Sequence, residues 1–222
     1  MVKQERAERT RETIINAAAS IFEEEGYTAA PLSGITRRAT VTKGALYFHF
    51  ASKRELAQAV VGEATDTLQV LLAEARRRRG RQLPLQILID LSHAVVGRLA
   101  DDPVLRAGLR LGADVDLFPE RGGLCVDWDG LVDELLRKPG GELAEQLQSG
   151  AWLAPLASVL TGLELLFRRK PEQIEQETLT SVWRLLLRGL ARSGEAGGYE
   201  PAGSARRSTP LPPARRGAAA DE

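Results

Sequence analysis

Residues 41–50 combine chemical groups that suit a groove lined by phosphates. Thr42 is a good N-cap, so a new helix is predicted to begin directly after it. That helix start offers free backbone amides, a hydroxyl, the ammonium of Lys43 and the phenol of Tyr47, which can all bind phosphate oxygens. An ordinary amphipathic helix explains the same residues equally well, because two of its apolar side chains lie four apart and can share a buried face.

Helices are predicted on the N-terminal side of this stretch. Apolar residues recur with helical spacing over residues 9–25, and Gly26 is predicted to end that helix. A short second helix is predicted over residues 31–39, with a tight turn leading into residues 41–50. Two short helices joined by such a turn, behind a longer first helix, form a helix-turn-helix. In this unit the N-terminal residues of the second short helix meet base edges in the major groove.

The composition limits the classes of function. The formal net charge is zero, but residues 1–54 carry nine Lys and Arg against six Asp and Glu. Cys125 is the only cysteine and His49 and His93 are the only histidines, so neither a thiolate metal cluster nor a Ser-His-Asp hydrolase is supported. Neither a membrane-spanning apolar run nor a signal-peptide pattern is found, which predicts a cytoplasmic protein without membrane contact. No metal or cofactor is expected.

An acid-rich region leaves two other classes to consider. Its carboxylates could bind a divalent ion for an enzyme, but they lack the loop pattern of a hard-cation site. A solvated loop and acids at a helix N-terminus explain them better, so no enzyme is expected. A purely structural protein is the other alternative, and it would bind no specific duplex. The acidic residues are Asp114, Asp116, Glu120, Asp127, Asp129 and Asp133.

The whole chain is predicted to be all-α, because proline and glycine fall mainly between periodic segments and no segment alternates like a strand for long. A long helix is predicted over residues 53–79. It ends in the arginine run 76–79, where cations offset the helix dipole; this explains them better than nucleic-acid contact does. The predicted parts are a DNA-binding domain (1–54), a helical ligand-binding and dimerisation domain (55–193) and a disordered tail (194–222) that has little to bury.

Residues 8–60 resemble the N-terminal domain of TetR-type repressors. The resemblance rests on Ala17-Ala18, Phe22, Gly26-Tyr27, Ile35, residues 41–50, Ser52-Lys53 and Leu56. It implies that the helix after Thr42 is the recognition helix and that six positions in and beside it touch operator phosphates or bases. An exposed arginine of the preceding helix is added to them. The predicted DNA-binding residues are Arg37, Thr42, Lys43, Gly44, Tyr47, His49 and Lys53.

The sequence departs from the family pattern in two features. Thr40 stands in the turn where glycine is usual, and threonine fits there if the backbone avoids positive φ. Pro31 and Gly34 stand where a Thr-x-x-Glu capping box is common. The side-chain cap is therefore lost, at a cost of about 1 kcal/mol, and the second helix is expected to be less stable at its start.

The rest of the chain resembles the γ-butyrolactone autoregulator receptors of antibiotic-producing actinobacteria. The residues that carry this resemblance are 103–111, Val126-Asp127-Trp128, Trp183 and Arg188-Gly189. It implies that Trp128 lines an effector pocket, where its indole stacks on an alkyl-lactone and donates one hydrogen bond. Thr161 is the candidate lactone partner, although its hydroxyl could equally bond to its own helix. Leu88 and Leu109 complete the predicted ligand-binding residues, and an antibiotic intermediate or an efflux drug is the alternative effector.

The last two predicted helices hold more apolar surface than one buried face needs, notably at residues 165–167 and 185–187. A wide buried stripe explains this equally simply, but TetR-type proteins dimerise through such a pair of helices. The resemblance therefore implies a homodimer that binds a pseudo-palindromic operator in double-stranded DNA.

Overall fold

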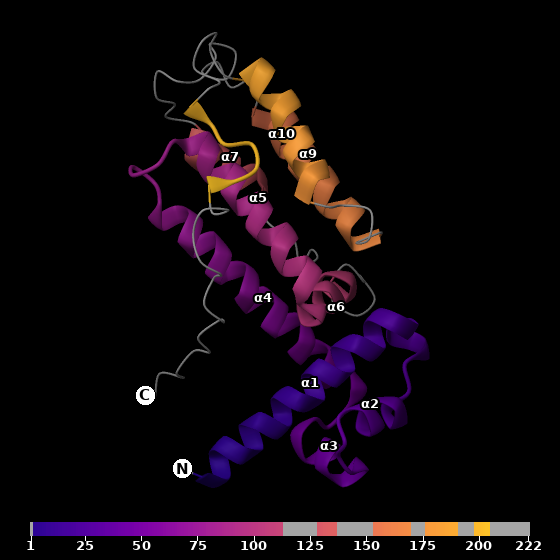
Figure 1. Ribbon diagram of the computed structural model, residues 1–222. Helices are drawn as coiled ribbons and strands as arrows, with labels where there is room; N and C mark the ends of the chain where they lie inside the picture. The colour runs from indigo at the N-terminus through magenta and orange to yellow at the C-terminus, as the bar shows by residue number, and fades with distance from the viewer. Residues whose placement is uncertain (1, 113–127, 137–152, 170–175, 191–197, 205–222) are drawn as a thin grey trace. The chain divides into compact units, whose positions relative to one another are not determined.

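The computed structural model describes residues 2–112, 128–136, 153–169, 176–190 and 198–204, and every named element within them is a helix (Figure 1). The all-α prediction is thereby confirmed. The helices are α1 (Val2–Ala29), α2 (Leu32–Arg38), α3 (Lys43–His49), α4 (Lys53–Arg77), α5 (Pro84–Asp101), α6 (Pro103–Gly112), α7 (Trp128–Leu136), α9 (Leu153–Arg169) and α10 (Gln176–Leu190). None of the described helices is long and apolar enough to cross a membrane.

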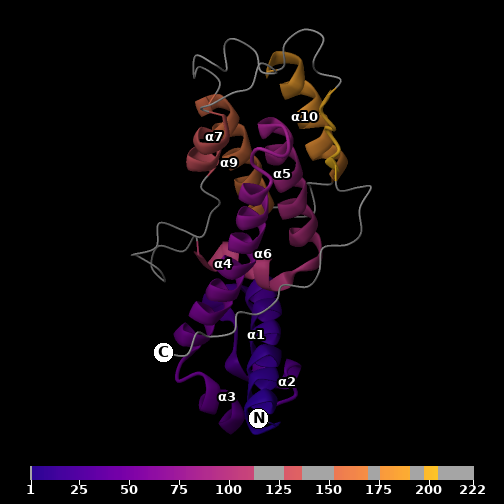
Figure 2. The same cartoon turned by 90° about the vertical axis from the view of Figure 1, so that its left-hand side faces the viewer.

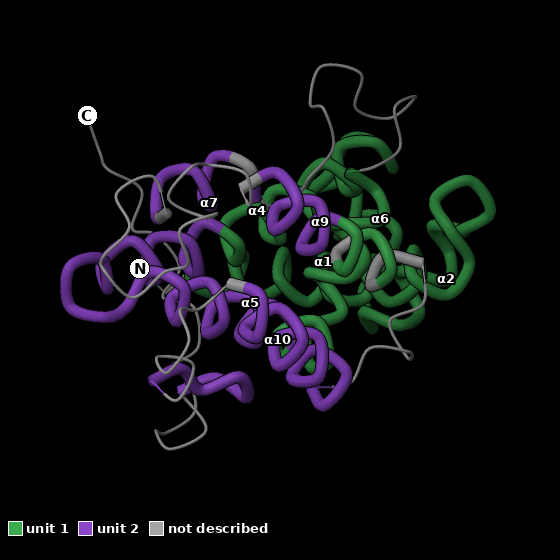
Figure 3. Tube along the Cα trace, turned by 90° about the horizontal axis from the view of Figure 1, so that it is seen from above, with its two compact units in different colours: residues 1–68, 97–127, 162–173 green, residues 69–96, 128–161, 174–222 purple. Residues whose placement is uncertain are grey.

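The chain divides into two compact units, drawn in green and purple in Figure 3. The first comprises residues 1–68, 97–127 and 162–173, and the second comprises residues 69–96, 128–161 and 174–222. The first unit thus combines the predicted DNA-binding helices with α6. The domain boundary after residue 54 stays a prediction.

The core of the first unit is built by α1 together with α2, α3, the first turns of α4, and α6. In Figure 1, α2 and α3 lie together on one side of α1. Figure 2 shows the same helices after a turn of 90°. Two guanidinium nitrogens of Arg106 on α6 donate to the Glu23 carboxylate of α1, at 2.6 and 3.3 Å. Arg110 adds a hydrogen bond of 2.9 Å to the Glu23 carbonyl oxygen. Charge-assisted pairs of this kind fix the orientation of α6 on α1.

Helix α6 also lies against α4 at a point where no side chain fits. A Cβ atom placed on Gly108 would lie 2.2 Å from the Cβ of Ala64 and 3.2 Å from the carbonyl oxygen of Val60. These two atoms belong to a buried helix and cannot rotate away. The absence of a side chain at Gly108 therefore sets how closely α6 and α4 approach.

Helix α1 differs from its predicted bounds at both ends. It begins at Val2 rather than residue 9, since pairs four residues apart, such as Glu5 and Arg9 at 2.8 Å, support the extra turns. Gly26 breaks the helix as predicted, with φ 77° and ψ 163°, but a further short helical turn follows it up to Ala29.

The turn between α2 and α3 corrects one expectation. Thr40 has φ 55°, so the backbone does not avoid positive φ there. The amide of Val41 donates to the Thr36 carbonyl at 3.0 Å and that of Thr40 donates to the Arg37 carbonyl at 3.2 Å. These two bonds form a Schellman motif, whose left-handed position usually holds glycine. The turn thus has the left-handed geometry for which glycine is usual, although its residue is β-branched and strained.

Replacing Thr40 with glycine is expected to stabilise the protein by about 1 kcal/mol, because glycine adopts positive φ without steric cost. Urea unfolding followed by circular dichroism measures the change. Thr10→Gly is the matched control: Thr10 lies within helix α1, so the same substitution should destabilise the protein by about 0.5–1 kcal/mol. If Thr40→Gly and Thr10→Gly changed the free energy of unfolding by the same amount and in the same direction, the backbone of Thr40 would not be strained.

Helix α2 starts as expected from its missing cap. Pro31 is the N-cap residue, in an extended conformation, and makes no side-chain capping bond. Its carbonyl oxygen accepts hydrogen bonds from the amides of Gly34 and Ile35, at 3.0 and 3.3 Å. The helix therefore begins on backbone bonds alone, and the predicted loss of the capping box is confirmed.

The arginines of the run at the end of α4 form ion pairs within the second unit. Arg76 and Arg79 pair with Glu134 of α7, at 3.1 and 3.5 Å. Arg77 pairs with Glu74, and Arg78 pairs with Glu74 and with Asp90 of α5. Every arginine of the run thus has an acidic partner, which supports a structural role. The absence of nucleic-acid contact there stays a prediction.

Part of the predicted disordered tail is folded. Residues 198–204 lie against α5 in the second unit, where Tyr199 and Gly203 are buried. The expectation fails here because hydrogen bonds to side chains of α5 hold the segment in addition to the burial of Tyr199. The remaining tail residues, 194–197 and 205–222, lie outside the described part of the chain.

Candidate nucleic-acid interface

The start of α3 is fixed by Thr42, as predicted. Its hydroxyl oxygen accepts a hydrogen bond from the Ala45 amide at 3.1 Å, and its carbonyl oxygen accepts one from the Leu46 amide at 3.1 Å. Leu46 and Phe50 are almost fully buried in the core of the first unit. The inner face of α3 is therefore anchored, which determines the face that is presented outward.

The outer face of α3 carries a cation and two aromatic rings. Lys43, Gly44, Tyr47 and Phe48 are exposed, with 44% of Tyr47 and 80% of Phe48 accessible. The Lys43 ammonium lies 5.8 Å from the centroid of the Tyr47 ring, in a cation–π contact. Within the described residues Lys43 makes no ion pair, so its charge is available to a phosphate.

The two arginines of α2 differ in whether their charge is already paired with a carboxylate. Arg38 is bound to the Glu24 carboxylate by two hydrogen bonds, at 2.6 and 3.0 Å. The side-chain hydrogen bond from Arg38 lowers the pKa of the Glu24 carboxyl. Arg37 is exposed and has no ion pair among the described residues. Arg37 rather than Arg38 therefore fits the predicted DNA contact.

Lys53 has a role within the fold. Its ammonium donates to the Thr28 carbonyl oxygen at 3.2 Å and lies 4.9 Å from the centroid of the Tyr27 ring. Burial lowers the pKa of the Lys53 ammonium. Lys53 therefore ties the start of α4 to the end of α1. A contact of this residue with DNA stays a prediction.

Phe48 was not among the predicted site residues, although it is the most exposed large apolar side chain on α3. Its ring meets that of His49 edge to face, with centroids 5.1 Å apart. A spacing argument could have identified it, because Phe48 lies two positions from each of the buried residues Leu46 and Phe50. An exposed apolar ring is chemically suited to contact a thymine methyl group in a major groove.

The predicted ligand-binding residues are not gathered in one unit. Leu88 of α5 and Trp128 of α7 are buried in the second unit, and Leu109 of α6 is buried in the first. Thr161 of α9 is exposed, and no hydrogen bond of its hydroxyl is found within the described residues. Its exposure does not fit a lactone partner enclosed by one chain. The ligand roles of all four residues stay predictions.

Several acidic residues of the weighed enzyme alternative, namely Asp114, Asp116, Glu120 and Asp127, lie outside the described residues. Among the residues that are described, no three histidine, cysteine or acidic side chains are grouped so that they could hold a metal ion.

An anchored helix-turn-helix with an exposed cationic and aromatic outer face, in a helical chain, defines the class of DNA-binding regulators. Residues 14–60 match the family described as bacterial regulatory proteins, tetR family. The chain is 34% identical over 206 residues to the A-factor receptor protein of Streptomyces griseus, covering 91% of this chain and 71% of that protein. The chain belongs to the tetR family of bacterial regulatory proteins.

Solved structures agree with this assignment over most of the chain. A γ-butyrolactone receptor described as ArpA-like matches with a TM-score of 0.70 and 30% identity, covering 92% of this chain and 99% of that one. CprB of Streptomyces coelicolor in complex with its biological operator sequence matches with a TM-score of 0.70 and 31% identity, covering 87% and 94%. The predicted resemblance to TetR-type repressors and γ-butyrolactone receptors is confirmed. The family consists of regulators, so the expectation that the chain is no enzyme is confirmed too.

Proposed function

We propose that this protein is a transcriptional repressor that binds an operator through α3 and leaves it when a γ-butyrolactone-type effector binds. The observation that carries the proposal is the outer face of α3, where Lys43 and Tyr47 are exposed while the inner face is anchored. The similarity to an A-factor receptor and to an ArpA-like γ-butyrolactone receptor supports the class of effector.

Two helices are suited to carry the effector signal. Helix α4 is one continuous element of 25 residues, whose first part belongs to the first unit and whose last part belongs to the second. Helix α6 is bound to α1 through Arg106 and Glu23 and is packed on α4 at Gly108. A shift of α4 on effector binding therefore moves the framework that positions α3.

A homodimer fits the apolar surface of the last two helices. Leu165 and Leu166 of α9 are 49% and 52% exposed, and Leu185 of α10 is 68% exposed. Exposed leucines on both helices fit a subunit interface of the kind that the family resemblance implies. A two-fold dimer would present two copies of α3 to successive major grooves of a pseudo-palindromic operator.

Operator selection tests the function. The purified protein is incubated with a pool of random duplexes, and bound DNA is recovered and sequenced. The proposal predicts an enriched inverted repeat that is released by γ-butyrolactones. Release by cationic drugs or antibiotic intermediates instead would show that the effector is not a γ-butyrolactone. Recovery of no enriched sequence would contradict the proposal that the protein is a repressor.

The variant Trp128→Phe is expected to weaken effector binding about tenfold and to leave operator affinity within about twofold. Trp128 is 3% exposed, so alanine would leave a destabilising cavity, whereas phenylalanine keeps an aromatic ring and removes the indole N–H. Calorimetric titration with a γ-butyrolactone measures the effect.

Trp183→Phe is the matched control for this prediction. The indole of Trp183 is also buried, and it donates to the Ser92 hydroxyl at 2.8 Å, so its loss should lower stability but spare effector affinity. Equal losses of effector affinity in the two variants would show that Trp128 acts through the fold and does not touch the effector.

A further inference from the structure

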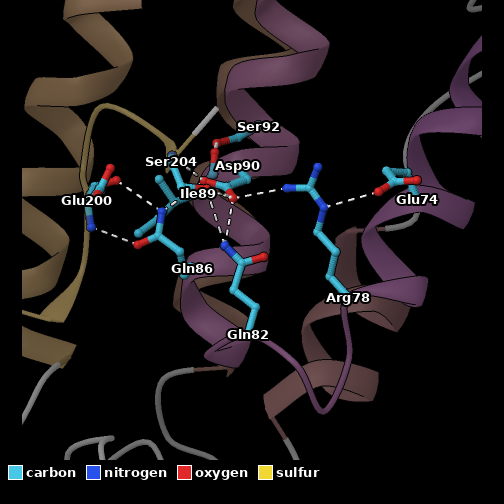
Figure 4. A network of polar contacts seen from close by, with 9 residues as sticks. All are labelled: Glu74, Arg78, Gln82, Gln86, Ile89, Asp90, Ser92, Glu200 and Ser204. Carbon is cyan, nitrogen blue, oxygen red and sulfur yellow. Dashed lines mark hydrogen bonds and ion pairs between the residues drawn. The ribbon is translucent and has the colours of Figure 1, made fainter. Parts of the chain in front are cut away.

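Helix α5 carries a polar stripe in an otherwise apolar, buried surface. Gln86, Asp90 and His93 are all buried and recur at spacings of four and three residues, so they lie on one face. Buried polar side chains are costly unless they are hydrogen-bonded. Gln86 and Asp90 bond to Glu200 and Ser204, more than a hundred positions away in the sequence (Figure 4), and His93 bonds to Pro201.

The side chains of this polar stripe bind the segment mainly through its backbone amides and carbonyl groups. The Gln86 side chain accepts from the Glu200 amide at 2.7 Å and donates to the Glu200 carbonyl at 3.1 Å. The Asp90 carboxylate accepts from the amide of Ser204 at 2.8 Å and from its hydroxyl. Nε2 of His93 donates to the Pro201 carbonyl at 2.8 Å. All of these contacts except that of the Ser204 hydroxyl involve the backbone of the segment.

The shape of the segment is also matched to α5. Gly203 has φ 81°, and a Cβ atom there would lie 3.4 Å from two ring atoms of His93. Both the backbone conformation and the space therefore favour glycine at this position. Tyr199 is buried at the other end of the segment. A seven-residue piece is thus recognised by hydrogen bonds, by a left-handed glycine and by one buried ring.

The Asp90 carboxylate links this segment to the end of α4. It also accepts from Arg78 at 3.2 Å, from Gln82 at 2.7 Å and from Gln86 at 2.8 Å. Arg78 in turn reaches the Glu74 carboxylate of α4 at 3.3 Å. Burial acts to raise the pKa of the Asp90 carboxyl, but the hydrogen bonds, led by those from Ser204, lower it overall. The carboxylate therefore stays ionised and holds three parts of the second unit together.

We infer that the polar face of α5 is a peptide-binding site, filled by residues 198–204 of the same chain as a C-terminal clasp that ties the end of α4 to α5. Three observations support this inference. Gln86 makes two hydrogen bonds to the backbone of Glu200, and Asp90 accepts two from Ser204. The third is that the space beside the His93 ring favours glycine at position 203. Neither operator recognition nor the effector requires such a site, so the clasp is an addition to the proposed function.

Hydrogen exchange in two full-length variants tests the clasp. Gly203→Ala adds a methyl group against His93 in a left-handed backbone, whereas Gly198→Ala adds one where nothing lies within 4 Å. In Gly203→Ala, the Glu200 and Ser204 amides and residues 74–82 are expected to exchange roughly tenfold faster than in the wild type. Gly198→Ala should match the wild type.

A synthetic peptide with the sequence of residues 198–204 tests the site itself. It should bind full-length Gly203→Ala at least about tenfold more tightly than the wild type, whose site is filled, and should restore slow exchange at residues 74–82. Ser204→Ala, which leaves the backbone free of strain, should give the same pattern more weakly. Equal exchange in both glycine variants, or equal peptide binding by variant and wild type, would overturn the inference.

Discussion

Gly108→Ala is expected to destabilise the first unit by about 3 kcal/mol, which is the largest stability effect predicted for a single methyl group in this protein. The added Cβ would lie 2.2 Å from the Cβ of Ala64, and both atoms are fixed to helix backbones. Relief requires α6 and α4 to move apart, which also strains the Arg106–Glu23 pair. Urea unfolding monitored by circular dichroism measures the loss, and operator binding should fall with it.

Gly62→Ala provides the comparison for this substitution. Gly62 lies in α4, and nothing would lie within 4 Å of its Cβ. Alanine is the better helix former, so this variant should gain about 0.5–1 kcal/mol. If Gly108→Ala were as stable as Gly62→Ala, the close approach of α6 to α4 would not exist in solution.

Lys43→Ala is expected to weaken operator binding about tenfold to a hundredfold and to reduce the slope of log affinity against log salt by about one. The ammonium is exposed on the outer face of α3, beside Tyr47, and makes no ion pair among the described residues. Its loss therefore removes a phosphate or base contact without disturbing the buried side of the helix. Fluorescence anisotropy with a labelled operator at several salt concentrations measures both quantities.

Arg77→Ala removes the same charge at a different place. Arg77 is exposed at the end of α4 and is paired with Glu74 in the second unit. This variant should keep operator affinity within about twofold and the salt slope unchanged. If Lys43→Ala and Arg77→Ala behaved alike, α3 would not be the element that reads DNA.

The helices and the reading face could be predicted from the sequence because their signals are local. Thr42 caps α3 with its own hydroxyl, and Leu46 and Phe50 lie on one side of a single helical turn. The left-handed conformation of Thr40 could not be predicted in the same way, since threonine disfavours it. The left-handed conformation goes with the two backbone hydrogen bonds of the turn, which the residue type at position 40 does not reveal.

Features that depend on distant partners escaped prediction. The clasp segment has the composition of a disordered tail, and its order comes from Gln86 and Asp90, both 114 positions away from their partners in it. The exposure of Thr161 depends on how complete helices pack. Periodicity identifies a buried face, but it does not state which other helix covers that face.

The most direct test of the repressor is a linked titration of the full-length protein. Operator affinity is measured with and without a saturating γ-butyrolactone, and effector affinity is measured with and without saturating operator. If effector binding releases DNA, both affinities fall by the same factor, about 5- to 150-fold. An effector affinity that is equal for the free and the operator-bound protein would contradict the proposed repressor.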